Sequence, residues 1–294
     1  RLRARSGQTM QPTVNHPPGY RNGRLYFDAS MRVLTTDFDV AAYTKRARPK
    51  INVDVGELRL DPVLHQDLEY LWRVEASALG DMRAMLSSWT GREARITAFL
   101  ATWAYERYWI AKALSDVLQA DGCPGPAMPG FQLVGAAHSL YVDYLLPTVA
   151  SLSTLLVREP MSAGHMARMA VHEGAMAAAY RALTPRVDAP VAAVFRQILL
   201  RRADFVDFFQ QEAAARIRRS TPELRSAQLH LWRWVPMRPD GVPDPDERRA
   251  IRSIFRTPES RLDVRSSDEV IGKLLPGNPL PMTRALRLVQ HRGK

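Results

Sequence analysis

The sequence predicts an all-α protein. From residue 61 onward, apolar residues recur at helical spacing over long stretches, and no stretch shows the two-residue alternation of a strand. Short segments rich in Gly and Pro separate these stretches. Long helices joined by short turns are typical of an antiparallel bundle. We expect an irregular arm over residues 1–60, a helical bundle over 61–219, and a helical and loop extension over 220–294 packed on the bundle.

The first 60 residues contain scattered Pro and Gly without a sustained helical period, so one short helix near residues 37–46 is the regular structure expected there. The bundle begins at Asp61-Pro62, a pair typical of a helix N-cap and first helical position. The long helices that follow share an apolar period of 3.6 residues. They are expected at about residues 61–86, 92–119, 131–157, 161–183 and 189–219.

Beyond residue 220 the pattern becomes shorter and more aromatic. The segment from Leu231 to Pro236 contains two Trp residues, and residues 244–255 are typical of a short capped helix. Prolines interrupt the chain before a last short helix expected at 283–290. This pattern predicts an accessory subdomain packed against the bundle.

Composition narrows the classes of partner and compartment. The net charge is +11, but the arginines are scattered and interspersed with acids, which disfavours nucleic-acid binding. Cys123 is the only cysteine, so no intrachain disulfide forms, as is typical of the reducing cytoplasm. The most apolar stretch, residues 142–157, contains Pro147 and is too short to span a bilayer. We expect a cytoplasmic protein without a membrane span.

Three glutamates lie on apolar helical faces. Glu75, Glu106 and Glu173 each have apolar residues at helical offsets on both sides. A carboxylate is rarely buried unless a cation, a metal or a hydrogen-bond network satisfies it. Three inward carboxylates on long helices predict either a carboxylate-bridged metal site inside the bundle or the remains of one.

The pattern leaves several roles open for these residues. Ion pairs with arginine are the favoured interpretation of all three glutamates. Should the site be catalytic, the candidates are Glu75, Glu106, Glu173 and His172. Should it bind metal, Asp204 joins them, because Asp204 follows Glu173 at the separation at which Glu106 follows Glu75.

Four segments carry a resemblance to a known group of proteins. They are Tyr70–Glu75, Ala98–Trp109, Arg202–Phe209 and Trp232–Pro236. On these segments the chain resembles the ferritin-like superfamily, of the di-iron carboxylate four-helix-bundle type, and is most similar to uncharacterised actinobacterial ferritin-like proteins. The resemblance implies a bundle related to oxidoreductases, in which one helix of each pair supplies a Glu and the next supplies Glu-x-x-His to two irons.

The departures from that pattern fall on the implied ligands. The resemblance places the ligand pair of the second helix at Arg107 and Ile110, and that of the last helix at Arg202 and Phe205. Both histidines are absent and both carboxylates are arginines. We therefore expect the metal ligands to be largely lost, with no metal and no cofactor bound. We expect Arg202 to reach Glu75 or Glu173 across the bundle, with Arg107 as a second partner.

Three functions remain at this stage. The first is a metal-free binding or structural protein with a degenerate di-iron site, acting as a homo-oligomer or with a protein partner. The second is a divergent non-haem iron oxidase or oxygenase. The third is a cofactor-independent enzyme of specialised metabolism that holds a small apolar ligand in the bundle.

Overall fold

A computed structural model describes most of the chain outside the N-terminal region and one long internal segment. The described residues are 20–21, 24–25, 34–54, 56, 58–122, 160–232, 234–238, 244–277 and 281–291. The chain divides into two compact units, Arg1–Thr35 and Thr36–Lys294. In the first unit, strand β1 (Tyr20–Arg21) pairs antiparallel with strand β2 (Arg24–Leu25). The second unit contains all the candidate site residues.

Regular structure in the described part of the second unit is helical, which confirms the all-α prediction there. The helices are α1 (Val40–Lys45), α2 (Pro62–Ala76), α3 (Ala78–Leu86), η1 (Trp89–Arg92), α4 (Ala94–Ala120), α7 (Met161–Leu183), η3 (Thr184–Arg186), α8 (Ala189–Arg219), α9 (Thr221–Trp232), α10 (Asp244–Ile254), α11 (Pro258–Gly272) and α12 (Pro281–His291). The helix predicted at 131–157 lies outside the described residues.

The helix expected over residues 61–86 is interrupted at Ser77, between α2 and α3. The Ser77 hydroxyl donates to the carbonyl of Val74 at 2.8 Å, and Arg107 donates to the same oxygen at 2.7 Å. These donors compete for the carbonyl that would accept the next helical N–H, so the helical ladder breaks there. The break therefore coincides with hydrogen bonds from Ser77 itself and from a side chain on another helix.

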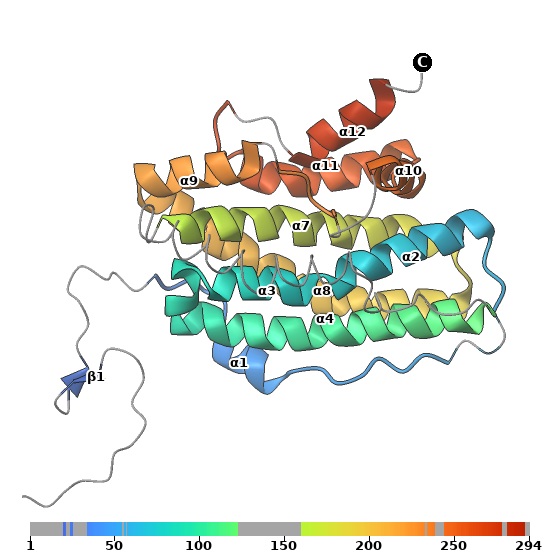
Figure 1. Ribbon diagram of the computed structural model, residues 1–294, viewed down its shortest axis with the longest axis horizontal. Helices are drawn as coiled ribbons and strands as arrows, with labels where there is room; N and C mark the ends of the chain where they lie inside the picture. The colour runs from blue at the N-terminus through green and yellow to red at the C-terminus, as the bar shows by residue number, and fades with distance from the viewer. Residues whose placement is uncertain are drawn as a thin grey trace, which may run out of the picture. The chain divides into compact units, whose positions relative to one another are not determined.

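Helix α7 lies at the centre of the helical layers (Figure 1). The hairpin of α2, α3 and α4 lies on one side, and α9, α10, α11 and α12 lie on the other. Helix α8 runs antiparallel to α7 and packs along it. Side chains at nearly every position of α7 are buried, so this helix has no solvent face.

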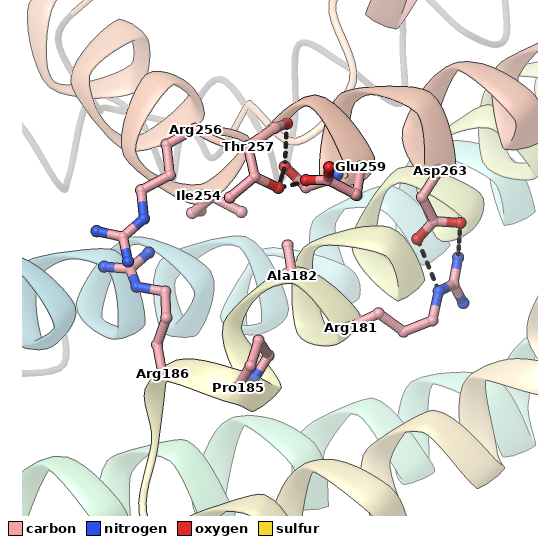
Figure 2. A pocket seen from close by; sticks show the side chains of 10 residues that line it. Arg181, Ala182, Pro185, Arg186, Ile254, Arg256, Thr257, Glu259 and Asp263 are labelled. Carbon is pink, nitrogen blue, oxygen red and sulfur yellow. Dashed lines mark hydrogen bonds and ion pairs between the residues drawn. The ribbon is translucent and has the colours of Figure 1, made fainter.

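The C-terminal helices complete the enclosure of α7. Helices α9 and α11 both pack on α7, although neither was expected from the sequence. Arg181 on α7 makes a two-point ion pair with Asp263 on α11, at 2.8 and 3.0 Å (Figure 2). The extension is thus part of the same compact unit as the bundle.

Residues 36–60, expected to belong to an irregular arm, contribute to the core. Phe38, Tyr43 and Ile51 are buried. The Phe38 ring packs edge-to-face against Phe99 of α4 and Phe208 of α8, with centroids 5.6 and 5.3 Å apart. The short helix expected near residues 37–46 is present as α1.

Among the described residues, no helix is both long and apolar enough to cross a membrane.

Candidate functional site: a buried cluster of glutamate and arginine

Four charged residues meet in the interior, one from each of α2, α4, α7 and α8. They are Glu75, Arg107, Glu173 and Arg202, and they are called the interior cluster below. Each is at most 1% exposed. Because charged side chains are rarely buried this fully without partners, their contacts account for their presence in the core.

Arg202 bridges the two glutamates. Its Nη2 donates to Glu75 Oε1 and its Nη1 donates to Glu173 Oε2. The contact predicted for Arg202 is therefore present, and it involves both glutamates rather than one. One guanidinium thereby joins α8 to α2 and α7.

Arg107 closes the cluster from α4. Its Nε donates to Glu75 Oε2 at 2.8 Å, and its Nη1 lies 3.6 Å from Glu173 Oε1. Two neutral donors complete the hydrogen bonding of the carboxylates. Tyr180 donates to Glu75 Oε1 at 2.8 Å, and the Trp103 indole donates to Glu173 Oε1 at 3.0 Å.

The cluster contains two negative and two positive charges. Burial alone would raise the pKa of Glu75, but Arg202, Arg107 and the Tyr180 hydrogen bond outweigh burial and hold that pKa below its ordinary value. Burial likewise disfavours the charged form of Arg202, but Glu75 and Glu173 raise its pKa above the ordinary value. Glu75 and Arg202 are thus both ionised at neutral pH.

His172 lies on α7 beside Glu173 without joining the cluster by a hydrogen bond. It is 6% exposed, and its Nδ1 accepts from the backbone N–H of Met237 at 3.4 Å. Its Nε2 has no hydrogen-bond partner among the residues that the structure describes. Burial, followed by the positive charges of Arg107 and Arg202, holds the pKa of His172 well below its ordinary value. His172 is therefore a neutral imidazole in the core.

Glu106 and Asp204 lie in a separate cluster rather than with Glu75 and Glu173, and Glu106 makes an ion pair with arginine, the favoured interpretation of its sequence pattern. Glu106 Oε1 accepts from the backbone N–H and the Nε of Arg48, at 2.8 and 3.0 Å. The same Arg48 also pairs with Asp204. Consecutive residues of a helix point about 100° apart, so Glu106 faces away from the cluster that its neighbour Arg107 enters.

Sequence reasoning missed Arg48 because it lies in an irregular segment, where no periodicity indicates which way a side chain points. The missed neutral donors did leave a signal. Trp103 precedes Arg107 by one helical turn on α4, and Tyr180 follows Glu173 by two turns on α7. Both are aromatic residues on largely apolar helical faces, and each also carries a hydrogen-bond donor.

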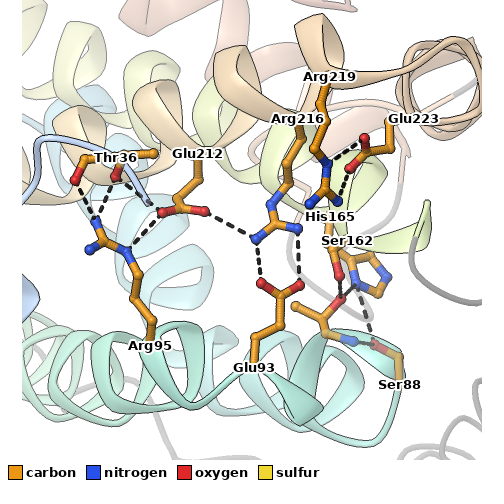
Figure 3. A network of polar contacts seen from close by, with 11 residues as sticks. Thr36, Ser88, Glu93, Arg95, Ser162, His165, Glu212, Arg216, Arg219 and Glu223 are labelled. Atoms are coloured by element: carbon orange, nitrogen blue, oxygen red, sulfur yellow. Dashed lines mark hydrogen bonds and ion pairs between the residues drawn. The ribbon is translucent and has the colours of Figure 1, made fainter. Parts of the chain in front are cut away.

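A further ion-pair network, also missed, links α4 and α8 near the start of α4 (Figure 3). Glu212 is fully buried and accepts from Thr36, Arg95 and Arg216, at 3.2, 3.1 and 3.1 Å. Arg216 also makes a two-point pair with Glu93, at 2.9 and 2.6 Å. The spacing of Glu212 and Arg216 by one helical turn is the signal that could have indicated it.

His165 makes its contacts apart from His172, although the two lie seven residues apart on α7. Its Nδ1 lies 2.9 Å from the hydroxyl of Thr90, which lies 3.2 Å from that of Ser162 (Figure 3). Burial, with His230 and Arg168 nearby, lowers the pKa of His165 to about 3. Both hydroxyls are fully buried, so this group joins η1 to α7 and offers no accessible nucleophile.

The residues of the interior cluster do not fit a di-iron centre. The carboxylate oxygens of Glu75 and Glu173 are engaged by arginine, tyrosine and tryptophan donors. Among the described residues, no group of three or more His, Cys, Asp or Glu is placed to hold a metal ion. Two iron ions need about six ligands with suitable geometry, and this donor set supplies two occupied carboxylates.

No family model, curated protein or solved structure matches this chain.

Proposed function

We propose that this protein is a metal-independent helical bundle with a binding or structural role, built on the ferritin-like plan. The interior cluster stands where a ferritin-like bundle would hold its metal. One observation supports the proposal. Helices α2, α4, α7 and α8 each contribute one charged residue to the cluster, and arginine stands at the two positions where the resemblance implies carboxylate ligands.

Electrostatics explains why arginine suits this place. Two carboxylates buried together without a cation would repel each other and become protonated. A guanidinium stays charged and meets carboxylates through parallel hydrogen bonds, so two arginines neutralise the pair without metal. A metal ion entering the cluster would meet Arg107 and Arg202 and be repelled by both.

The alternatives receive less support from the geometry. An iron oxidase would need Glu106 and Asp204 beside Glu75 and Glu173, but both are paired with Arg48. A cofactor-independent enzyme would need an accessible acid or base, but the interior cluster is at most 1% exposed and His172 is 6% exposed.

Metal analysis tests the proposal. The full chain is produced in iron-supplied cells, and Fe, Mn and Zn are measured by mass spectrometry together with the near-ultraviolet absorption of the protein. We expect metal well below one ion per chain. Two irons per chain, or the absorption band of oxo-bridged iron, would contradict the proposal.

Rebuilding the ligands tests the ferritin-like plan itself. The variant Arg107→Glu, Ile110→His, Arg202→Glu and Phe205→His restores the implied Glu-x-x-His pairs. On that plan, we expect the variant to take up about two irons per chain when it is refolded with Fe²⁺. A folded variant that binds no more iron than the wild-type protein would remove the ferritin-like part of the proposal and leave the metal-independent part standing.

A further inference from the structure

A cavity of about 350 Å³ lies between the end of α7 with η3 and the turn from α10 into α11 (Figure 2). Its size is at the lower end of the range for small-molecule sites. Apolar and charged side chains line it together. The lining residues are Arg181, Ala182, Pro185, Arg186, Ile254, Arg256, Thr257, Glu259, Ser260 and Asp263.

The two ends of the cavity differ in their charge balance. At one end, Arg181 and Asp263 neutralise each other through their two-point ion pair. At the other end, the side chains of Arg186 and Arg256 extend toward each other (Figure 2). The Arg186 end therefore has two arginines, whose contacts decide whether a positive charge remains there.

Arg186 is held from inside the protein. Its Nη2 lies 2.9 Å from Asp67, a carboxylate that is 2% exposed, and its Nη1 donates to the carbonyl of Ser253 at 3.3 Å. Arg256 is exposed, and its guanidinium makes no ion pair with any residue that the structure describes. Asp67 balances one of the two arginines, so the second remains available for an anion.

The rest of the lining favours an organic anion over a free inorganic ion. Ala182, Pro185 and Ile254 supply an apolar wall beside the two arginines. The start of α11 adds the positive end of a helix dipole. The hydroxyl of Thr257 caps this helix by accepting a hydrogen bond from the backbone N–H of Ser260 at 3.2 Å. Glu259 lies away from Arg186 in Figure 2 and disfavours an anion at its own end.

Resting on the binding role above, we propose that this cavity binds a small organic molecule bearing a phosphate or carboxylate group. The anionic group lies between Arg186 and Arg256, and the apolar body lies on Ala182, Pro185 and Ile254. Arg256 is the residue that determines anion specificity, because Arg186 is already paired with Asp67.

Calorimetric titration of the full chain with phenyl phosphate, benzoate, inorganic phosphate and benzyl alcohol tests the proposal. We expect phenyl phosphate or benzoate to bind more tightly than inorganic phosphate, and benzyl alcohol not to bind. Whichever of phenyl phosphate and benzoate binds more tightly identifies the anionic group. Equal affinity for phenyl phosphate and inorganic phosphate would contradict the proposal that the apolar residues contact the ligand.

A pair of charge-matched variants locates the site. Arg256→Gln should weaken binding about tenfold or more, the loss expected for one charge-assisted hydrogen bond. Arg196→Gln removes an exposed arginine of α8 that lines no part of the cavity, and binding should be unchanged. Both residues are exposed, so both variants should keep the thermal midpoint of the wild-type protein.

Absence of binding at about 10 mM of either aromatic anion would overturn the proposal, and so would an equal loss in the two variants. Neither result bears on the metal content of the protein, so failure of this site is distinguishable from failure of the proposed function.

Discussion

At the scale of the residue, the interior cluster depends on charge parity. Two glutamates and two arginines, each at most 1% exposed, sum to zero net charge. Removing one member leaves an uncompensated charge in the core, whereas removing one of each sign does not. The cost of a substitution should therefore depend on whether a net charge remains in the core more than on how many hydrogen bonds the substitution removes.

Arg202→Leu tests this dependence of stability on the remaining net charge. It leaves Glu75 and Glu173 with Arg107 alone, a net negative charge in the interior. We expect the free energy of unfolding to fall by about 3–5 kcal/mol, the cost typical of breaking a buried ion pair. Denaturant unfolding at neutral pH, followed by circular dichroism, measures the change.

The double variants of Arg202 are the controls for that substitution. Arg202→Leu with Glu173→Leu leaves Glu75 and Arg107, which are joined by a hydrogen bond of 2.8 Å, so it should recover much of the loss. Arg202→Leu with Glu75→Leu leaves Arg107 and Glu173 at 3.6 Å and should recover less. Double variants less stable than Arg202→Leu would refute charge parity as the controlling factor.

His172 should make the protein less stable in mild acid. Its folded pKa lies well below its ordinary value of 6.5, so the unfolded chain binds the proton first as pH falls. Stability is then lost below about pH 6.5, by about 1.4 kcal/mol per pH unit for this one group. The free energy of unfolding between pH 7 and pH 5, compared between the wild-type protein and His172→Gln, isolates that slope.

The comparison is needed because another buried group acts in the opposite direction. Burial raises the pKa of Asp268 to about 6, so the folded chain binds that proton first and gains stability as pH falls through 6. Asp268 is unchanged in His172→Gln, so it cancels in the difference. Identical slopes in the two proteins would mean that His172 is not held neutral by the fold.

At the scale of the element, α7 accepts close neighbours because small residues line it. A Cβ atom added to Gly164 would lie 2.2 Å from Nδ1 and 2.4 Å from Cγ of the His230 ring on α9. At Gly174 the added Cβ would meet the flexible hydroxyl of Ser267 on α11 at 2.0 Å, with the Ser267 Cβ at 3.4 Å. The Ser267 hydroxyl can rotate away from an added Cβ, whereas several atoms of the His230 ring would clash with one, so Gly164 is the less tolerant of the two positions.

Gly164→Ala should lower the free energy of unfolding by about 1–3 kcal/mol, as overpacking of a close-packed interface does. Gly80→Ala in α3 is the matched control, because no atom lies within 4 Å of its added Cβ. That control should raise the free energy of unfolding by up to about 1 kcal/mol through helix propensity alone. Thermal or denaturant unfolding of the two variants distinguishes packing from propensity, and stabilisation by both would refute the close approach of α9.

The helices also show what periodicity could and could not reveal. Helices α7 and α8 begin and end at the predicted residues because Pro and Asp lie at or next to their ends. Periodicity did not indicate the break at Ser77, because one of the two donors to the Val74 carbonyl there is Arg107 on a different helix. The contact of Arg202 with the glutamates was expected because the resemblance implies a metal ligand at that position. The pairing of Glu106 with Arg48 required knowing the path of an irregular segment.

At the scale of the whole molecule, the bundle and the C-terminal extension share one core. Helix α7 is buried on the sides that face α9 and α11 as well as on the sides that face α2 and α8. Residues Thr36–Lys294 accordingly form one compact unit, which includes the segment after residue 220. Unfolding of this unit should be a single cooperative transition.

Truncation tests whether α7 depends on the C-terminal helices. A chain ending at Arg219 lacks α9 to α12, so it would expose the parts of α7 around Gly164 and Gly174, which lie against His230 of α9 and Ser267 of α11. We expect this fragment to aggregate or to bind a hydrophobic dye, with no cooperative thermal transition. Size-exclusion chromatography and scanning calorimetry measure these outcomes. A chain beginning at Thr36, which lacks only the first compact unit, should keep the thermal midpoint of the full chain. A monomeric fragment ending at Arg219 that unfolds at the midpoint of the full chain would show that the bundle folds without its C-terminal cover.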